Sequence, residues 1–516
     1  MPTRGHLFVV QADLSRIAAD AFLIPCDNHA NVSGGWRPFI EEGANAQPSA
    51  EWFRPNGVTL ENGLAVLPDT TTPEGKPMPD QIIGLRVLVD TVSVTSIAEM
   101  VDRAANAVSA AAKRARRHGG RSLPLVALPI LGVGQGNFPG QRAEVVRELI
   151  GRLREFVASH DIDVALVLRR TSDYAAAQWA RKLADDAAIN GWPELSAEHR
   201  KLADRLGEAA GRGELSIFAG AGVSKPVGFP DWKELLEELA GKKLPFHAKT
   251  DYPQLAQDLG IPDLNAKVAR RFRTRKHGLG HALLADLRTS AMVTTNYDPC
   301  LENASVVIHR APRLQVLARE LAVGGHPWLL KLHGDIESPK TIVLTREQYN
   351  QLEVEHRALR GLVQSLMLTS HLLFVGFGFS DDDFLAMSEA VANVRQLADN
   401  RDPAAKVGTA VGLRESTERP HDQLAYHHLT PADTNVAAAA RLLEILLDRI
   451  AWRCQISGDA RGAYLLDPDY ERDATEDDRA VRGALLALEK TADAHPGSAG
   501  HRAVKDLLAQ LGYRPR

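Results

Sequence analysis

Four polar clusters, each directly after a short apolar run, are the parts of this sequence best suited to chemistry. They read Gly-Ala-Gly-Val-Ser at 220–224, Thr-Thr-Asn-Tyr-Asp at 294–298, Leu-His-Gly-Asp at 332–335 and Gly-Phe-Gly-Phe-Ser at 376–380. Glycines followed by a small hydroxyl residue at a strand end present backbone N–H groups to a pyrophosphate. A glycine also lets the phosphate approach, because a Cβ would block it. The first cluster therefore predicts a phosphate site.

The other three clusters would share that site if they follow strands of one parallel sheet. Ligands of open α/β sheets bind outside the carboxyl ends of the strands, so four such ends predict one crevice. A helix cap accounts well for Ser380, but a cap would need neither His333 nor Asn296.

Two further glycine-rich turns lie near the N-terminus. Gly34 and Gly35 follow the apolar run at 21–24, and three glycines at 132–136 follow the run at 126–129. Two glycine loops at strand ends suggest a second phosphate cradle.

The elements that would position these loops alternate between strands and helices. In the N-terminal part, strands are predicted at 7–10, 21–24, 83–89, 126–129 and 164–168, and amphipathic helices at 96–117 and 142–159. Further strands are predicted at 215–219, 291–294, 328–332, 341–344, 372–375 and 406–413, with helices between most of them. This alternation indicates an α/β fold with two parallel-sheet domains, the second doubly wound.

Three segments follow from these patterns. The turn Asn-Gly-Trp-Pro at 190–193 separates a first domain, 1–190, from a second, 191–458. A polar extension at 459–516 contains predicted helices near 475–494 and 499–511.

Composition narrows the function classes. The 516 residues carry 61 basic against 65 acidic side chains, a net charge of −4, so nothing indicates nucleic acid or an anionic membrane as a partner. The three cysteines form no Cys-x-x-Cys pair, which argues against a zinc knuckle or a disulfide framework and fits a reducing cytoplasm. No stretch approaches the roughly 18 apolar residues that span a bilayer, and no signal peptide is expected.

The four clusters, in this order and together with Gly-Phe-Pro-Asp-Trp at 228–232, resemble the sirtuin family over about 194–453. The resemblance implies a Rossmann-like sheet that binds NAD. It implies that Asn296 and Asp298 contact the nicotinamide ribose or position a water, and that His333 is the general base. The cofactor-binding residues that it implies are Gly220, Ala221, Gly222, Ser224, Asp231, Thr295, Gly376, Gly378 and Ser380.

One departure from the family bears on the reaction. Protein-deacylating sirtuins usually carry a zinc module with four cysteines after the catalytic histidine, whereas no cysteine lies here between His333 and Cys454. The basic segment 242–281, without clear strand character, is expected to replace part of the small domain. The sequence is therefore more similar to the NAD-hydrolysing, sirtuin-like effectors of bacterial antiphage defence. That branch implies a glycohydrolase that cleaves NAD to nicotinamide and ADP-ribose, with no metal.

Residues 7–160 resemble a macro domain, the fold that binds ADP-ribose and related nucleotides. The resemblance implies that Asp13 meets the adenine amine. Asp27 stands where the family often has asparagine, so ligand binding is expected rather than hydrolysis of ADP-ribosyl groups. The ligand-binding residues implied are Asp13, Asp27, Gly34, Gly35, Gly132, Gly134, Gly136 and Phe138. A degenerate scaffold that only mediates contacts is the alternative.

Together the two resemblances predict a regulated, NAD-depleting enzyme whose macro-like domain senses a nucleotide or controls assembly. A cytoplasmic homo-oligomer is expected, because an enzyme that consumes cellular NAD must be held inactive. Two alternatives stay open: an NAD-dependent protein deacylase or ADP-ribosyltransferase, and a non-catalytic nucleotide-binding scaffold.

Overall fold

The chain forms two compact units, each built on one sheet. The computed structural model describes residues 4–40, 52–67, 84–115, 120–188, 191–247, 250–309, 313–317, 319–320, 324–355, 357–379, 382–396, 406–416, 423–472 and 474–513. Unit 1 comprises 1–117, 123–211 and 448–516, and unit 2 comprises 118–122 and 212–447. Residues 191–211 and 448–458, which were expected in the second domain, therefore pack within unit 1.

Within its described residues, unit 1 has a sheet of six strands in the order β1-β8-β7-β2-β6-β5, in which the pair β5–β6 is antiparallel and the other pairs are parallel. Their bounds are β1 (Leu7–Gln11), β2 (Ala21–Cys26), β5 (Leu64–Leu67), β6 (Leu85–Asp90), β7 (Leu125–Leu128) and β8 (Asp163–Leu168). Two short strands, β3 (Val32–Ser33) and β4 (Trp52–Phe53), pair separately beside the 3₁₀ helix η1 (Gly34–Phe39).

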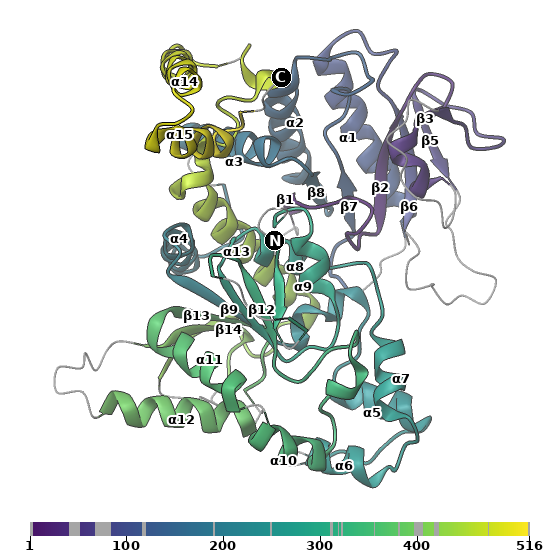
Figure 1. Ribbon diagram of the computed structural model, residues 1–516. Helices are drawn as coiled ribbons and strands as arrows, with labels where there is room; N and C mark the ends of the chain where they lie inside the picture. The colour runs from purple at the N-terminus through teal and green to yellow at the C-terminus, as the bar shows by residue number, and fades with distance from the viewer. Residues whose placement is uncertain are drawn as a thin grey trace. The chain divides into compact units, whose positions relative to one another are not determined.

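Three helices cover one face of this sheet (Figure 1): α1 (Ile97–Arg114), α2 (Arg142–Val157) and α3 (Thr171–Ala188). Alternate strand residues such as Leu23, Val87 and Leu166 pack into the core with these helices, as the period of two in a strand requires. Helix α1 begins after Ser96, whose hydroxyl accepts the N–H of Glu99 at 3.1 Å.

The C-terminal part of the chain completes unit 1. It includes the end of α13 (Val436–Ser457), η5 (Asp459–Gly462), η6 (Pro468–Tyr470), α14 (Glu476–Ala494) and α15 (Ala499–Gln510), and α4 (Ala197–Gly211) also belongs to this unit. The buried Asp448 accepts the indole N–H of Trp192 at 2.8 Å, pairs with Arg181, and lies 3.0 Å from His6 Nε2. Burial alone would raise the pKa of Asp448, but Arg181 and His6 hold it below its ordinary value.

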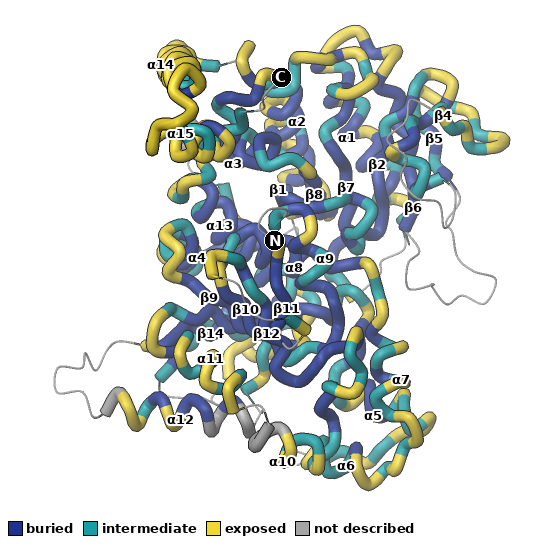
Figure 2. Tube along the Cα trace, viewed as in Figure 1, coloured by how far each residue is buried: buried dark blue, intermediate teal, exposed yellow. Residues whose placement is uncertain are grey.

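The sheet of unit 2 has seven parallel strands in the order β11-β12-β10-β9-β13-β14-β15. Their bounds are β9 (Leu215–Ala219), β10 (Ala291–Thr294), β11 (Gln315–Leu317), β12 (Trp328–Lys331), β13 (His371–Val375), β14 (Gly408–Arg414) and β15 (Leu424–Thr430). Figure 2 shows these strands as mostly buried. Two parallel-sheet α/β layers with a helical C-terminal segment confirm the predicted fold class.

The helices of unit 2 form two groups. Helices α10 (Arg346–Glu355), α11 (Arg357–Thr369) and α12 (Asp382–Gln396) follow β12 or β13, and Val363 and Met367 of α11 pack with Phe218 and Phe374 of the sheet. A satellite core around Phe229, Leu236 and Val268 joins α5 (Trp232–Ala240), α6 (Tyr252–Asp258) and α7 (Leu264–Arg271). Two more helices, α8 (Leu279–Ala285) and α9 (Cys300–Ser305), lie between β9 and β11 in the chain.

One predicted strand is wrong. Residues 341–344 form the end of the 3₁₀ helix η4 (Pro339–Thr341) and an extended segment outside the sheet. Ile342 and Leu344 are buried in the satellite core instead, so their apolar character reflects packing against helices. The segment 242–281, in which no clear strand was expected, contains α6, α7 and the start of α8, joined by turns and irregular segments.

Candidate functional site

Four strand ends of unit 2 lie in register along one edge of the sheet. Ala219 pairs with Thr294 on one side and with Val375 on the other, and Thr294 pairs with Lys331. The clusters at 220, 295, 332 and 376 therefore begin at the same level, as predicted. The chain leaves β9 toward β10 and later returns to β13 on the opposite side of β9, so the strand order reverses there. Such a reversal is where open α/β sheets bind ligands.

The glycines at 220 and 222 allow two loops to touch. The Gly220 N–H donates to Val375 O and the Gly222 N–H donates to Gly376 O, both at 2.9 Å. A Cβ at 220 would lie 2.5 Å from Gly376 O, and one at 222 would lie 2.9 Å from Gly376 Cα. Contact between the loops after β9 and β13 thus requires these glycines in this structure, whereas the sequence pattern attributed them to a phosphate.

The hydroxyl of Ser224 is the centre of a buried hydrogen-bond network. It donates to Asp298 Oδ2 at 2.8 Å, accepts from Asn296 Nδ2 at 3.1 Å, and lies 3.2 Å from His281 Nε2. Asn296 Nδ2 also donates to Gly220 O at 3.1 Å. Since one hydroxyl offers one donor and two acceptor positions, these contacts use its whole capacity. Ser224 therefore organises the site, and its contact with a phosphate stays a prediction.

His281 is a member of this network that the motifs did not indicate. Its Nδ1 accepts the Gly278 N–H at 3.2 Å, so the proton of the neutral ring is on Nε2, which donates to Ser224. Burial is the main cause that lowers the pKa of His281 to about 4, although Asp298 opposes the shift. In the sequence, two histidines around glycines at 277–281 were the only sign of a special role, and they did not indicate that His281 contacts Ser224.

A fully buried lysine supports the loop that carries Asn296 and Asp298. Lys331 Nζ donates to Tyr297 O at 2.9 Å, to Asp298 O at 2.7 Å and to Glu302 Oε1 at 3.0 Å. Asp298 is itself buried, and its Oδ1 accepts the Cys300 N–H at 3.0 Å. Lys331 thereby holds the backbone of Asp298, and the Cys300 N–H holds the carboxylate that accepts the Ser224 hydroxyl.

His333, the base that the sirtuin resemblance implies, lies two residues after Lys331, the last paired residue of β12. It is buried, and its Nδ1 lies 3.4 Å from the hydroxyl of Tyr349. Gly334 follows with φ of +90°, and a Cβ there would lie 2.0 Å from Thr341 O. The turn after His333 therefore depends on glycine.

The remaining residues predicted to contact NAD differ in exposure and in their hydrogen-bond partners. Asp231 caps α5 by accepting the Glu234 N–H at 2.9 Å and pairs with Lys225 at 2.9 Å, a structural role. Thr295 is half-buried at the shared edge, and Gly378 lies in the loop after β13. Ser380 lies outside the described residues. Ala221 is exposed at the tip of the first loop.

Among the residues that the structure describes, one group of possible metal ligands occurs: His281, Asp298 and Cys300 offer ligand atoms within 4.8 Å of one another. The contacts of Ser224 with Asp298 and with His281 already occupy an oxygen and a nitrogen of this group. Hydrogen bonding is sufficient to account for the arrangement.

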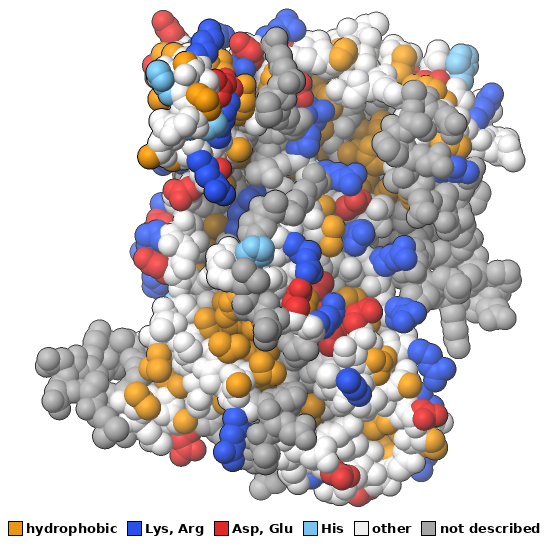
Figure 3. All heavy atoms as spheres, in the orientation of Figure 1, with side chains coloured by type: hydrophobic (Ala, Val, Ile, Leu, Met, Phe, Trp, Pro, Cys, Tyr) orange, Lys and Arg blue, Asp and Glu red, His pale blue; other side chains and the backbone are white. Residues whose placement is uncertain are grey.

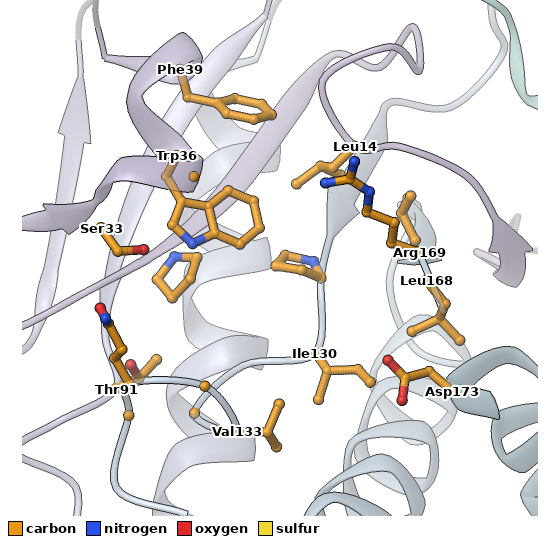
Figure 4. Close-up of a pocket in the computed structure, with 18 of the residues that line it drawn as sticks. Leu14, Ser33, Trp36, Phe39, Thr91, Ile130, Val133, Leu168, Arg169 and Asp173 are labelled. Carbon is orange, nitrogen blue, oxygen red and sulfur yellow. The ribbon is translucent and has the colours of Figure 1, made fainter. Parts of the chain in front are cut away.

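Unit 1 has its own pocket, of about 510 Å³, at the carboxyl ends of β1, β2, β6, β7 and β8. Figure 4 shows Trp36 and Phe39 on one side of it and Leu168, Arg169 and Asp173 on the other. Of the predicted ligand residues, the pocket is lined by Asp13, Gly35, Gly132, Gly134 and Gly136. The aromatic wall from η1 was not predicted, because Gly34 and Gly35 indicated only a turn.

The glycine loop at 132–136 closes on itself. Gly132 has φ of +76°, and a Cβ there would lie 2.4 Å from Met100 Sδ. A Cβ on Gly136 would lie 2.5 Å from Gly132 Cα, whereas Gly134 has open space around it. Phe138 is buried beneath this loop and donates its N–H to Gly132 O at 3.0 Å.

Three predicted residues are not among those lining the pocket: Asp27, Gly34 and Phe138. The carboxylate of Asp27 accepts the N–H groups of His29 and Asn31, both at 2.8 Å, so it stabilises its own turn. Burial tends to raise the pKa of Asp27, but the hydrogen bonds from Asn31 and His29 lower it overall. Asp13 lines the pocket, and its Oδ1 accepts the Ser15 N–H at 3.0 Å.

Comparison with known proteins supports one of the two resemblances directly. Residues 290–431 match the family model described as SIR2-like domain, which confirms the sirtuin resemblance for the segment that contains Asn296, Asp298 and His333. None of the helices within the described residues combines the length and the apolar character that crossing a membrane requires.

Several curated proteins are similar to part of this chain. The NAD(+) hydrolase ThsA of Enterococcus faecium is 31% identical over 198 residues, which cover 36% of this chain and 41% of the relative. ThsA of Bacillus cereus (strain MSX-D12) is 30% identical over 178 residues, covering 32% and 37%. Defense-associated sirtuin 2 of Bacillus subtilis is 26% identical over 191 residues, covering 34% and 19%. The chain thus matches less than half the length of these relatives.

Two solved structures with local similarity are macrodomains of Oceanobacillus iheyensis. The one with MES bound is 15% identical, covers 35% of this chain and 93% of that chain, and has a TM-score of 0.25. The one with ADP is 13% identical, covers 35% and 92%, and has a TM-score of 0.25.

Proposed function

We propose that this protein hydrolyses NAD to nicotinamide and ADP-ribose at the carboxyl edge of the unit 2 sheet. The observation that carries the proposal is the buried network of Ser224, Asn296 and Asp298 at the point where the strand order reverses. The SIR2-like match over 290–431 and the names of the NAD(+) hydrolase relatives support it. The relative named a defence-associated sirtuin supports a role as an NAD-depleting effector in antiphage defence.

In the proposed reaction, water attacks C1′ of the nicotinamide ribose. The bond from C1′ to the nicotinamide nitrogen breaks, its electron pair leaves with nicotinamide, and His333 accepts the proton of the water. Both N–H groups of Asn296 are directed to protein oxygens, so its Oδ1 can accept a hydrogen bond from a ribose hydroxyl or from the water. Asp298 and Ser224 hold that amide in place. The loop at Gly220 and Ala221 would border the diphosphate.

The test replaces the base. We expect His333→Ala to lower nicotinamide release from NAD by about 10²–10⁴-fold, the usual effect of removing a general base. His247→Ala is the matched control, because His247 is exposed in the same unit. Equal turnover by His333→Ala would refute the assignment. Formation of O-acyl-ADP-ribose with an acylated peptide, or of ADP-ribosylated protein, would favour the alternative reactions.

We also propose that the pocket of unit 1 binds an ADP-ribose-type nucleotide. Its volume of about 510 Å³ suits a small ligand. The indole of Trp36 offers a stacking surface opposite the glycine loop (Figure 4). Trp36→Ala should weaken binding of ADP-ribose in calorimetry, whereas Trp179→Ala, outside the pocket lining, should not.

We propose further that the protein is a cytoplasmic homo-oligomer. Its three cysteines are buried and form no disulfide within the described part of the chain, which suits a reducing compartment. Figure 3 shows hydrophobic side chains over α11, where Leu362 and Leu368 are exposed, and such side chains support an association surface. Leu368→Glu should shift the mass of the assembly in light scattering, and an unchanged mass would remove α11 from the interface.

A further inference from the structure

An acidic side chain on the wall of the unit 1 pocket has no role in the proposal above. Asp173, at the start of α3, lines the pocket and is 4% exposed. Figure 4 shows its carboxylate beside Ile130 on the pocket wall. A carboxylate in this position can accept hydrogen bonds from amino or hydroxyl groups of a ligand.

Two arginines and one tyrosine hold this carboxylate. Arg142 Nη1 donates to Asp173 Oδ2 at 2.9 Å, and Arg170 Nε lies 3.8 Å from Oδ1. The hydroxyl of Tyr470 donates to Oδ1 at 2.8 Å. Tyr470 lies 297 positions after Asp173, in η6. It belongs to residues 459–516, here called the C-terminal segment. A carboxylate has about four acceptor positions, so the two close contacts leave capacity for a ligand.

The C-terminal segment also holds the two arginines, which themselves line the pocket. Arg170 donates to Asp469 at 2.6 Å and to Asp467, and Arg142 Nε lies 3.5 Å from Asp469. Asp467 and Tyr470 are almost completely buried. Residues 467–470 therefore support the back of the pocket wall through three charged residues.

The same segment carries the terminal helices. The Leu466 N–H donates to Leu511 O at 2.8 Å, and Arg482 Nη1 donates to Leu465 O at 2.7 Å. Helices α14 and α15 are otherwise largely exposed (Figure 2), with Arg482, Ala492 and Leu508 as their buried residues. Their attachment to unit 1 thus depends strongly on residues 463–470.

We propose that Asp173 accepts a hydrogen bond from an amino or ribose hydroxyl group of the bound nucleotide, and that Tyr470 positions it for this contact. Because one carboxylate then joins the ligand to η6, occupancy of the pocket stabilises docking of the C-terminal segment, and docking strengthens binding by the same factor. This inference rests on the proposed nucleotide binding in unit 1.

The first test measures binding of ADP-ribose to the full chain by calorimetry. Tyr470→Phe removes only the hydroxyl that reaches Asp173, and we expect its Kd to rise about fivefold or more, the usual lower range of such coupling. Tyr464→Phe is the matched control, since it makes the same change in the same segment, with its ring centroid 5.9 Å from that of Tyr470. Its Kd should equal that of the unmodified protein.

The second test measures hydrogen exchange of the amides in α14 and α15. ADP-ribose should slow this exchange in the unmodified protein and in Tyr464→Phe, but much less in Tyr470→Phe, an effect that a merely structural tyrosine would not produce. Failure of the unmodified protein to bind ADP-ribose would overturn the proposed nucleotide site together with this inference. Binding with an unchanged Kd in Tyr470→Phe and unchanged exchange in α14 and α15 would overturn the coupling alone.

Discussion

Replacing His281 with glutamine tests whether the network around Ser224 contains a neutral histidine. His281 is 1% exposed, and burial lowers its pKa to about 4, against the ordinary 6.5. Glutamine can donate an N–H to Ser224 but does not titrate. The variant should therefore keep the hydrogen bond and lose the pH dependence that His281 contributes.

The sign of that contribution follows from the lowered pKa. Above about pH 6.5 His281 is neutral in both the folded and unfolded states, so it adds no pH dependence. As the pH falls from 6.5 toward 4, the unfolded chain takes up a proton that the folded protein does not, and the free energy of unfolding decreases. Integrated to about pH 5, this linkage amounts to about 2 kcal/mol.

The assay is urea unfolding of the full chain at about pH 7.5 and about pH 5, followed by tryptophan fluorescence. Between these two conditions, the unmodified protein should lose about 2 kcal/mol more stability than His281→Gln does. His247→Gln, an exposed position in unit 2, is the control and should behave as the unmodified protein. An equal loss of stability in His281→Gln and the unmodified protein would refute the neutral, buried assignment.

Three other substitutions test individual contacts. Gly220→Ala should lower the melting temperature, since its Cβ would lie 2.5 Å from a carbonyl oxygen of the neighbouring loop, and overpacking of this kind costs about 1–3 kcal/mol. Lys331→Met should reduce the free energy of urea unfolding by about 1–3 kcal/mol, because the buried carbonyl oxygens of Tyr297 and Asp298 would lose this donor, while Glu302 would keep its pair with Arg319. In unit 1, Gly132→Ala should impair binding of ADP-ribose in calorimetry, whereas Gly134→Ala, with open space around it, should have little effect; the reverse order would contradict the loop geometry.

Much of the fold could be predicted because short apolar runs mark buried parallel strands. The strand expected at 215–219 has the same bounds as β9, and the strand ends of unit 2 meet in register as their polar clusters indicated. The failed strand at 341–344 has the same composition as a true strand. Only the packing of Ile342 and Leu344 against helices distinguishes it, and that packing is a tertiary property.

The site could be predicted only in outline. Motifs identified Ser224, Asn296 and Asp298, but they did not indicate His281, which also contacts the Ser224 hydroxyl and comes 57 positions after it. The ligand contact of Asp27 stays a prediction, and the sequence did not indicate that its carboxylate accepts hydrogen bonds from the backbone of its own turn. A residue type shows which hydrogen bonds a side chain can make, and the fold decides which partners it has.

The division of unit 1 along the chain has a consequence for synthesis. Its buried Asp448 contacts His6 and Arg181, so the first strand and the third helix obtain this partner only after residues 212–447 have left the ribosome. The inserted unit can fold first, since its segments are almost contiguous, and domains generally fold as units during translation. A stop codon or a proteolytic cut before 448 would therefore damage unit 1, which loses residues 448–516, more than unit 2, which ends at 447. Such a fragment could retain the proposed catalytic residues without a complete unit 1.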